Sequence, residues 1–137
     1  MKPKVEVLLD SSFLMLPSVK RINLLSELDR VLNRGYKLVT LPNVVRELEK
    51  LASQGDPGVR RRAKLALELL RGLNVEVLDI KIEGGTDKAI VESSKGRRWV
   101  VATVDRELRA KLRRMGVPTI YLRGEKRLEL EGEVLDS

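Results

Sequence analysis

Four acidic residues occupy positions from which they could act together at one site. Asp10 directly follows an apolar run, Asp87 and Asp105 each open a stretch with helical periodicity, and Glu47 lies about one turn into another such stretch. Carboxylates that gather without an imidazole or thiol form a hard-oxygen site, which suits Mg²⁺ or Mn²⁺. Such ions activate water and neutralise charge in phosphoryl transfer and phosphodiester hydrolysis. The four acids therefore indicate a metal site that acts on phosphate esters.

The composition excludes most other catalytic chemistries. The 137 residues include no His and no Cys, which rules out zinc fingers, thiol nucleophiles, Ser–His–Asp triads and disulfides. The net charge is +7, and residues 125–137 alone hold five acidic and two basic side chains. A basic body suggests a polyanionic partner, most commonly nucleic acid, and a solvated surface would explain the charge equally well.

Each of the four acids has a simpler explanation when it is considered alone. Asp10, Asp87 and Asp105 stand near the starts of helical stretches, where Asp often only caps the helix. Other residues that could supply these caps are Ser11, Ser12 and Thr86. Glu47 alone would be a surface residue beside the core. The joint pattern is harder to explain in this way, because helical projection places Asp87 and Asp105 on apolar faces, where an unpaired carboxylate is costly.

The elements that must position these acids alternate between strands and helices. Short apolar runs predict strands at 5–9, 37–41, 75–80, 99–104 and 118–122. Apolar residues at helical spacing predict helices over 20–33, 42–51, 59–71, 86–95 and 105–115. Strands that are apolar on both faces and alternate with helices indicate a three-layer α/β/α domain with a five-stranded parallel sheet. Ligands of such sheets bind beyond the carboxyl ends of the strands, where all four acids fall.

The ends of the chain and its hydropathy set the expected organisation. Residues 1–124 are expected to form a single domain, followed by an acidic C-terminal tail over residues 125–137 that adds at most a strand or turn. No apolar run approaches the ~20 residues that cross a bilayer. Residues 1–5 lead into the first strand without the apolar segment of a signal peptide. We therefore expect a cytoplasmic protein with no membrane partner.

The segments around the four acids resemble those of the PIN domain family of metal-dependent ribonucleases. These segments are 9–14, 45–48, 86–90 and 102–108. The stretch 101–122 resembles in particular the archaeal Fcf1/Utp24-like branch, the PIN nucleases of small-subunit rRNA maturation. In all, the resemblance covers about residues 5–123.

The resemblance implies a parallel sheet of strand order 3-2-1-4-5, one or two Mg²⁺ or Mn²⁺ ions, and endonucleolytic cleavage of RNA that leaves a 5′-phosphate. The implied metal-binding and catalytic acids are Asp10, Glu47, Asp87 and Asp105. Ser11 and Thr103 are the implied catalytic hydroxyls, which would orient the acids or a bound water. Many members have Asn two residues after the first acid. Ser12 stands there in this chain, and its shorter side chain is expected to reach the site only through water.

Basic residues near the acids are candidates for contacts with RNA phosphates. They are Arg60 and Arg61 in the third predicted helix, Lys88 beside Asp87, and Arg106 and Arg109 close to Asp105. The chain has only four aromatic residues, so base stacking is not expected to be its main mode of binding. Phe13 and Tyr121 are expected in the core, and Trp99 either in the core or on the surface.

The expected function is that of a metal-dependent endoribonuclease that acts on an rRNA precursor in small-subunit maturation. Two alternatives stay open: a toxin-type ribonuclease with an antitoxin partner, and an RNA-binding scaffold with weak catalysis among ribosome-assembly factors. The resemblance also leaves a homodimer open. A response-regulator receiver and a haloacid-dehalogenase-type phosphatase fit less well, because both need a second acid near the first strand, where this chain has Ser11 and Ser12. Neither a Walker loop nor a dinucleotide fingerprint follows that strand.

Overall fold

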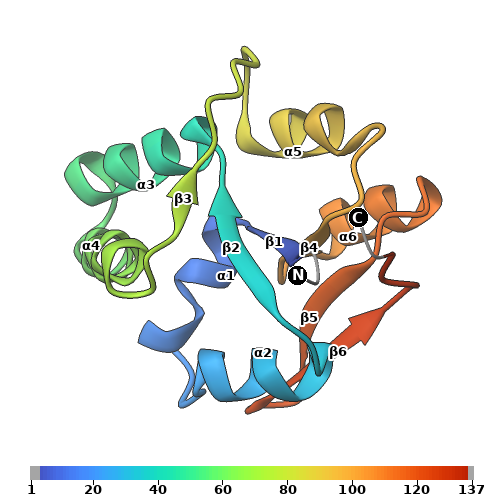
Figure 1. Cartoon of the computed structure of the whole chain (residues 1–137). Coiled ribbons are helices and arrows are strands. Elements are labelled where there is room, and N and C mark those ends of the chain that lie inside the picture. Colours follow the sequence, from blue (N-terminus) through green and yellow to red (C-terminus); the bar gives the residue numbers. More distant parts are fainter. Residues whose placement is uncertain (1–3, 136–137) are drawn as a thin grey trace.

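A single six-stranded sheet runs through the protein, of which a computed structural model describes residues 4–135 (Figure 1). Its strands are β1 (Val5–Leu9), β2 (Tyr36–Thr40), β3 (Glu76–Val77), β4 (Val100–Ala102), β5 (Thr119–Arg123) and β6 (Arg127–Glu131). Their order is β3-β2-β1-β4-β5-β6. The first five strands pair in parallel, which confirms the predicted order, and β6 adds an antiparallel strand beside β5.

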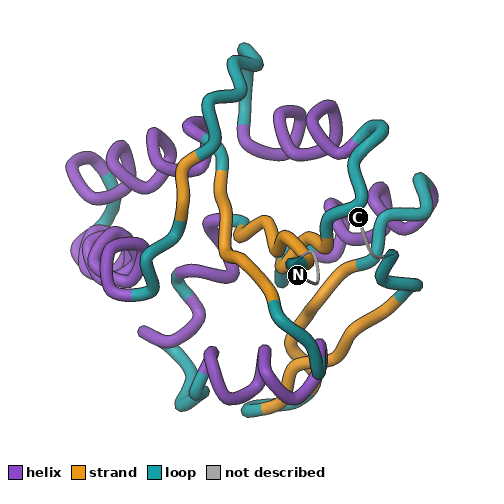
Figure 2. Tube along the Cα trace, in the orientation of Figure 1, coloured by secondary structure: helices purple, strands orange, loops and turns teal. Residues whose placement is uncertain are grey.

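Six α-helices and one 3₁₀ helix surround the sheet in the described part of the chain (Figure 2). They are α1 (Ser11–Leu14), η1 (Leu16–Ser18, 3₁₀), α2 (Leu24–Leu32), α3 (Pro42–Gln54), α4 (Pro57–Gly72), α5 (Thr86–Ser94) and α6 (Arg106–Arg114). Helices α3 and α4 pack together beside β2 and β3, α6 lies against β5, and α5 contacts both α3 and α6 (Figure 1). Over residues 4–135, none of these helices is long and apolar enough to cross a membrane.

The core lies around the two central strands, β1 and β4. Almost all of their residues are fully buried, as expected for parallel strands covered by helices on both faces. Phe13 and Trp99 are buried in this core, and the Trp99 indole donates to the Ser94 hydroxyl at 2.9 Å. Tyr121 is only half-buried, so its predicted place in the core is wrong. Its ring faces α6 and stacks under the guanidinium of Arg109, 3.8 Å from the ring centroid.

Two predicted elements are shorter in the structure. The helix predicted over 20–33 begins only at Leu24, because the Asn23 side chain caps it by accepting the N–H of Ser26. The buried strand predicted over 75–80 pairs with β2 only at Glu76 and Val77, both of them exposed. It ends early because β2 stops at Thr40 and the chain turns into α3 at Pro42, which leaves nothing beyond Leu78 for that strand to pair with.

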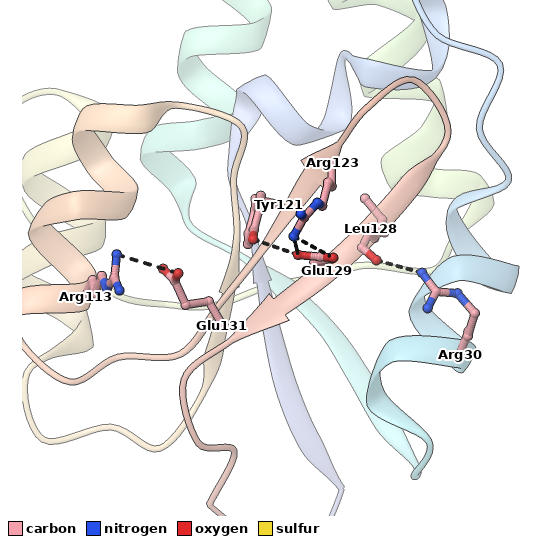
Figure 3. Close-up of polar contacts among 7 residues, drawn as sticks. All are labelled: Arg30, Arg113, Tyr121, Arg123, Leu128, Glu129 and Glu131. Carbon is pink, nitrogen blue, oxygen red and sulfur yellow. Dashed lines mark hydrogen bonds and ion pairs between the residues drawn. The ribbon is translucent and has the colours of Figure 1, made fainter.

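Strand β6 comes from the segment that the sequence suggested was an acidic tail. Its acidic side chains pair within the molecule: Glu129 with Arg123 at 2.9 Å and with the Tyr121 hydroxyl at 2.8 Å, and Glu131 with Arg113 of α6 at 3.6 Å (Figure 3). The last acidic residue of the predicted tail, Asp136, lies outside the described residues.

The outer edge of β6 is closed by two side chains of α2. The Glu27 carboxylate accepts the N–H of Leu128 at 2.8 Å, and the Arg30 guanidinium donates to the carbonyl of Leu128 at 2.7 Å (Figure 3 shows the second contact). The two side chains also pair with each other at 2.9 Å. Hydrogen bonds from Arg30 and from the Leu128 N–H lower the pKa of Glu27 to about 2. An acid–base pair thus takes the place of a further strand along this edge.

Candidate active site

Asp10 adds one hydrogen bond to the ladder between β1 and β4, and it caps the helix that follows, α1. Its N–H donates to the carbonyl of Ala102 at 3.0 Å, so β1 and β4 stay in register up to this residue. Its carboxylate accepts the N–H of Ser11 at 2.8 Å and so caps α1. Asp10 is only 3% exposed. It is therefore a helix cap, as the simpler explanation had it, and also a buried carboxylate at the carboxyl end of a central strand.

Two hydroxyls hold the second oxygen of Asp10. Ser12 Oγ and Thr103 Oγ1 each donate to Asp10 Oδ2 at 2.7 Å. The same hydroxyls accept backbone N–H groups, Ser12 from Val104 at 3.2 Å and Thr103 from Asp105 at 3.1 Å. The expectation that Ser12 acts only through water is wrong, because α1 starts directly after Asp10 and turns the Ser12 side chain back onto it. These contacts tie the end of β1 to the end of β4.

Glu47 joins the site through Ser11. The Ser11 hydroxyl hydrogen-bonds to Glu47 Oε1 and lies 3.4 Å from Asp10 Oδ1. Helix α3 can deliver Glu47 here because it starts at Pro42, immediately after β2, and Pro suits a first helical position that has no use for an N–H. One hydroxyl thus bridges two of the predicted acids.

Asp105 caps α6. Its Oδ1 accepts the N–H groups of Glu107 at 2.9 Å and Leu108 at 3.1 Å. No residue in the described range 4–135 donates to Oδ2 of Asp105. The prediction of a capping acid and that of a ligand are compatible here, because one carboxylate oxygen serves the helix and the other is free for an external cation.

Asp87 lies in the first turn of α5, where the charges of Asp105 and Asp10 act on its carboxylate. Burial raises its pKa most, followed by the charges of Asp105 and Asp10, while Lys111 of α6 lowers it. The segment before Asp87 is held by Asn43 of α3, which donates to the carbonyls of Ile82 at 2.8 Å and Gly84 at 3.1 Å. Asn43 is 5% exposed, and its Oδ1 is buried without a partner among the described residues.

We call the edge of the sheet that carries Asp10, Glu47, Asp87 and Asp105 the acidic rim. Its negative charge favours a bound cation. Burial raises the pKa of Asp10, hydrogen bonds from Thr103, Ser12 and Ser11 oppose that rise, and the charge of Glu47 adds to it. A buried carboxylate beside like charges is costly to ionise unless a cation is present. Over residues 4–135, no three carboxylates converge tightly enough to enclose an ion by themselves. The acidic rim therefore offers carboxylate oxygens that are separate from one another but contribute to the same negative electrostatic potential.

The predicted basic residues occupy different surroundings. Arg106 is exposed directly after Asp105, and Lys88 is exposed directly after Asp87. Arg109 is half-buried against Tyr121. Arg60 and Arg61 line a separate hollow of about 410 Å³ on α4, and no contact in the described part of the chain joins them to the acids.

Three residues of the site escaped the sequence analysis: Ser12 as a direct partner of Asp10, Asn43, and Lys111. Ser12 could have been found from its spacing, since a hydroxyl two residues after a capping acid turns back onto that acid. Asn43 had a weaker signal, a polar side chain one helical turn before Glu47. The effect of Lys111 on Asp87 depends on how α5 and α6 meet, which no local pattern in the sequence shows.

Known proteins similar to this chain point to one family. The profile described as PIN like domain matches residues 7–125. Ribonuclease VapC4 of Methanocaldococcus jannaschii is 27% identical over 125 residues, 91% of this chain and 95% of the relative. Ribonuclease VapC9 of Archaeoglobus fulgidus is 34% identical over 89 residues, 65% of this chain and 63% of the relative.

Solved structures agree with this family at the level of the fold. The structure of the PIN domain endonuclease Utp24 matches with a TM-score of 0.78 and 24% identity, covering 94% of this chain and 92% of that one. A domain of a functionally unknown Methanocaldococcus jannaschii protein matches with a TM-score of 0.61 and 15% identity, covering 97% and 99%. The strand order, the acids at the carboxyl ends of the strands and the profile match agree, and the chain belongs to the PIN-like domain family.

Proposed function

We propose that this protein is a metal-dependent endoribonuclease that hydrolyses RNA phosphodiesters. The observation that carries the proposal is Asp10, a buried carboxylate held by three hydroxyl-bearing residues and placed in one electrostatic field with Glu47, Asp87 and Asp105. Two relatives by sequence are named ribonucleases, and a structural relative is named an endonuclease, which supports this reaction.

The donor set fits Mg²⁺ or Mn²⁺. Every candidate ligand is a carboxylate oxygen, and Oδ2 of Asp105 has no protein donor in the described residues. Mg²⁺ commonly keeps several waters and takes only one or two carboxylates with substrate phosphates, so separate acids suit it better than a closed cage would. Asp10, Glu47, Asp87 and Asp105 would hold one or two ions. When bound, such an ion supplies an activated water and neutralises charge on the phosphodiester.

The remaining residues position these acids and the RNA. Ser12 and Thr103 fix the orientation of the Asp10 carboxylate, and Ser11 sets the separation between Asp10 and Glu47. Loss of a hydrogen bond to a metal-binding residue, from a residue that does not itself bind the metal, typically lowers metal affinity or activity ten- to a hundredfold. Arg106, Lys88 and Lys111, close to Asp105 and Asp87, would contact phosphates near the scissile bond. In this proposal Arg109, Arg60 and Arg61 contact the RNA further away.

Two biological roles fit this reaction, both in the cytoplasm. The resemblance of residues 101–122 to the Fcf1/Utp24-like branch implies action on an rRNA precursor in small-subunit maturation, with ribosome-assembly factors as partners, and the fold shared with the PIN domain endonuclease Utp24 is compatible with this role. The sequence likeness to VapC4 and VapC9 supports a toxin-type ribonuclease with an antitoxin as partner. A scaffold role with weak catalysis is less well supported, because all four acids are present.

The test is incubation of the purified protein with labelled RNA in Mn²⁺, Mg²⁺ or EDTA. A small-subunit rRNA precursor, an unrelated structured RNA and a single strand should be compared. We expect discrete cleavage that EDTA abolishes and that Asp10→Asn reduces at least about a hundredfold, beyond the usual effect of an outer residue. Asp56→Asn, an exposed acid before α4, is the matched control and should cleave normally. Full cleavage by Asp10→Asn, or binding without cleavage in either metal, would overturn the proposal.

A further inference from the structure

Arg109 differs from the other basic residues of α6. It is half-buried, and its guanidinium lies over the Tyr121 ring, 3.8 Å from the centroid. The others are exposed: Arg106, Lys111, Arg113 and Arg114. Within residues 4–135, no acidic side chain pairs with Arg109 and no acceptor takes its side-chain N–H groups. A stacked guanidinium keeps its N–H donors available while its plane is held by the ring.

The Tyr121 ring is itself fixed by the last strand of the sheet. Its hydroxyl donates to Glu129 of β6 at 2.8 Å, and Glu129 pairs with Arg123 at 2.9 Å (Figure 3). Tyr121 and Glu129 lie directly opposite each other in the antiparallel ladder, so both are anchored by the backbone. Because the ring is already ordered, Arg109 loses little further freedom when its guanidinium binds an anion.

Arg109 lies next to the acidic rim. It follows Asp105 by one turn of α6, and its N–H donates to the Asp105 carbonyl at 3.0 Å. Side chains of a helix lean towards its N-terminus, so the Arg109 side chain leans towards Asp105. On the sheet, the carbonyl just before Tyr121 accepts the N–H of Thr103, the residue that donates to Asp10. A group bound to Arg109 is therefore only about one helical turn, ~5.4 Å along the axis, from the cap of α6.

Two further arginines continue this surface beyond Tyr121. Arg123 and Arg127 lie opposite each other, two residues beyond Tyr121 and Glu129 and so on the same face of the hairpin. They line a hollow of about 380 Å³. Like charges directly opposite each other destabilise a sheet, and a bound anion would remove this cost. Arg127 is exposed and has no salt bridge within the described range. We call the surface formed by Arg109, Tyr121, Arg123, Arg127 and Glu129 the arginine face.

We propose that the RNA strand leaves the acidic rim across the arginine face. Arg109, positioned by Tyr121, binds a phosphate that flanks the scissile one, and Arg127 binds a phosphate further along the strand. This inference rests on the proposed function, which supplies RNA as the ligand. Guanidinium groups bind phosphate oxygens through paired N–H donors, and contacts with phosphates carry no base preference of their own. The arginine face therefore sets the path of the strand and not the choice of base.

The first test is the binding of labelled single-stranded RNA in EDTA, followed by fluorescence anisotropy at several salt concentrations. Arg109→Gln and Arg127→Gln should each weaken binding about tenfold. Each should also reduce the slope of log K against log salt by about 0.7, the value for one phosphate contact on a single strand. Arg114→Gln removes an exposed charge at the far end of α6 and is the matched control, which should keep the wild-type slope.

A double-mutant cycle tests the role of Tyr121. Tyr121→Leu removes the ring under Arg109 and should weaken binding of the same RNA, and Tyr121→Phe, which keeps the ring, should lose less. In the presence of Arg109→Gln, Tyr121→Leu should have no further effect, because the ring acts only through Arg109. Circular dichroism shows whether each variant keeps the fold. Losses that add independently would overturn the positioning role of Tyr121.

Cleavage in Mn²⁺ locates the contact along the RNA. A single neutral methylphosphonate linkage beside the cleavage site should slow the wild type, and Arg109→Gln should no longer distinguish this RNA from the unmodified one. A variant that still responds to the neutral linkage overturns the placement of Arg109. Binding in EDTA does not depend on cleavage: the expected losses of binding, in a protein that cuts no RNA in either metal, refute the nuclease and support the arginine face. Arg109→Gln that binds as tightly as the wild type, or Arg114→Gln that loses as much, overturns the inference.

Discussion

The two halves of the acidic rim are held in different ways. Asp10 and Asp105 follow the central strands β1 and β4, and Thr103 joins them by bonding to the carboxylate of one and the N–H of the other. Asp87 follows a long connection that touches the rest of the rim through Asn43. The first half is fixed by the same contacts that hold the core together. The second half is held by the Asn43 side chain and by the buried residues Ala89 and Ile90 of α5.

This difference predicts where substitutions will act. In the Asp10 half, a lost contact also weakens the packed centre of the sheet, so its cost should appear in the stability of the whole protein. In the Asp87 half, a lost contact frees a segment with few ladder bonds, so its cost should appear as local opening. The experiments below begin with the largest expected effect.

Asp10→Asn should make the metal-free protein more stable at neutral pH, by roughly 1 kcal/mol or more, because it removes a buried charge and keeps the shape. The Asn amide can donate to the hydroxyls that now donate to Asp10. Urea unfolding in EDTA measures the gain. Asp87→Asn should change stability by less, since Asp87 is only partly buried. A less stable Asp10→Asn protein would mean that the hydrogen bonds of Asp10 outweigh the cost of its burial.

The gain from Asp10→Asn should also depend on pH. Burial raises the pKa of Asp10 in the folded state. A raised carboxyl pKa costs folding free energy above the folded-state value, and this cost vanishes as pH falls towards the unfolded value of 3.8. The difference in unfolding free energy between the variant and the wild type should therefore shrink on acidification. A difference that grows as the pH falls would contradict the raised pKa.

Thr103→Val should lower both stability and cleavage. The substitution keeps the shape but removes the donor to Asp10 and the acceptor for the N–H of Asp105. We expect a loss of about 1–3 kcal/mol in unfolding free energy and of about ten- to a hundredfold in cleavage. Thr103→Ser keeps the hydroxyl and should retain most of both. Equal losses in the Ser and Val variants would show that the methyl group matters, and not the hydrogen bonds.

Asn43→Ala should separate the two halves most clearly. The carbonyls of Ile82 and Gly84 lose their donor, but water can replace it, so global stability should fall by less than about 1 kcal/mol. Hydrogen exchange measured by mass spectrometry should speed up over residues 82–90 and stay unchanged in β1 and β4. Cleavage should fall about tenfold because Asp87 is less well placed. Ser53→Ala, which removes a hydroxyl at the far end of α3, is the control. Faster exchange throughout the core would show that Asn43 supports the whole fold.

The smallest expected effect is the electrostatic coupling between the two halves of the acidic rim, which the pKa of Asp87 reports. Asp105 raises the pKa of Asp87, so Asp105→Asn should lower it, and Lys111→Met should raise it because Lys111 opposes the shift. Carboxyl ¹³C titration by NMR in EDTA measures both changes. An unchanged pKa of Asp87 in both variants would show that the two halves are electrostatically independent.

The parallel order of the sheet and the four acids could be predicted because both follow from local patterns. Alternating strands and helices limit the topology, and a parallel sheet gathers whatever follows its strands at one edge. The segment after β3 shows the limit of such patterns. Residues 75–80 have a good strand pattern, yet the length of the ladder depends on where β2 ends, which is information from 36 residues earlier in the chain.

The sequence also did not show which side chains contact one another in the folded protein. Whether Ser12 touches Asp10 depends on how sharply the chain turns at α1, and whether Tyr121 is buried depends on where α6 places Arg109. Strand β6 has a clear alternation of apolar and charged residues, but its acids suggested a solvated tail. Their partners, Arg113 and Arg123, became apparent only when the sheet placed them alongside.

The acid–base pair on β6 also protects this edge of the sheet against pairing with a neighbouring chain. A sheet with two unprotected edges can add copies without end, and edge-to-edge growth of this kind leads to fibres. Glu27 and Arg30 occupy the outward N–H and C=O of Leu128, so a neighbouring chain has nothing to bond there. A chain that approached β6 would find the central backbone groups of this strand already bonded, which is one of the ways in which natural sheets avoid growth at an edge.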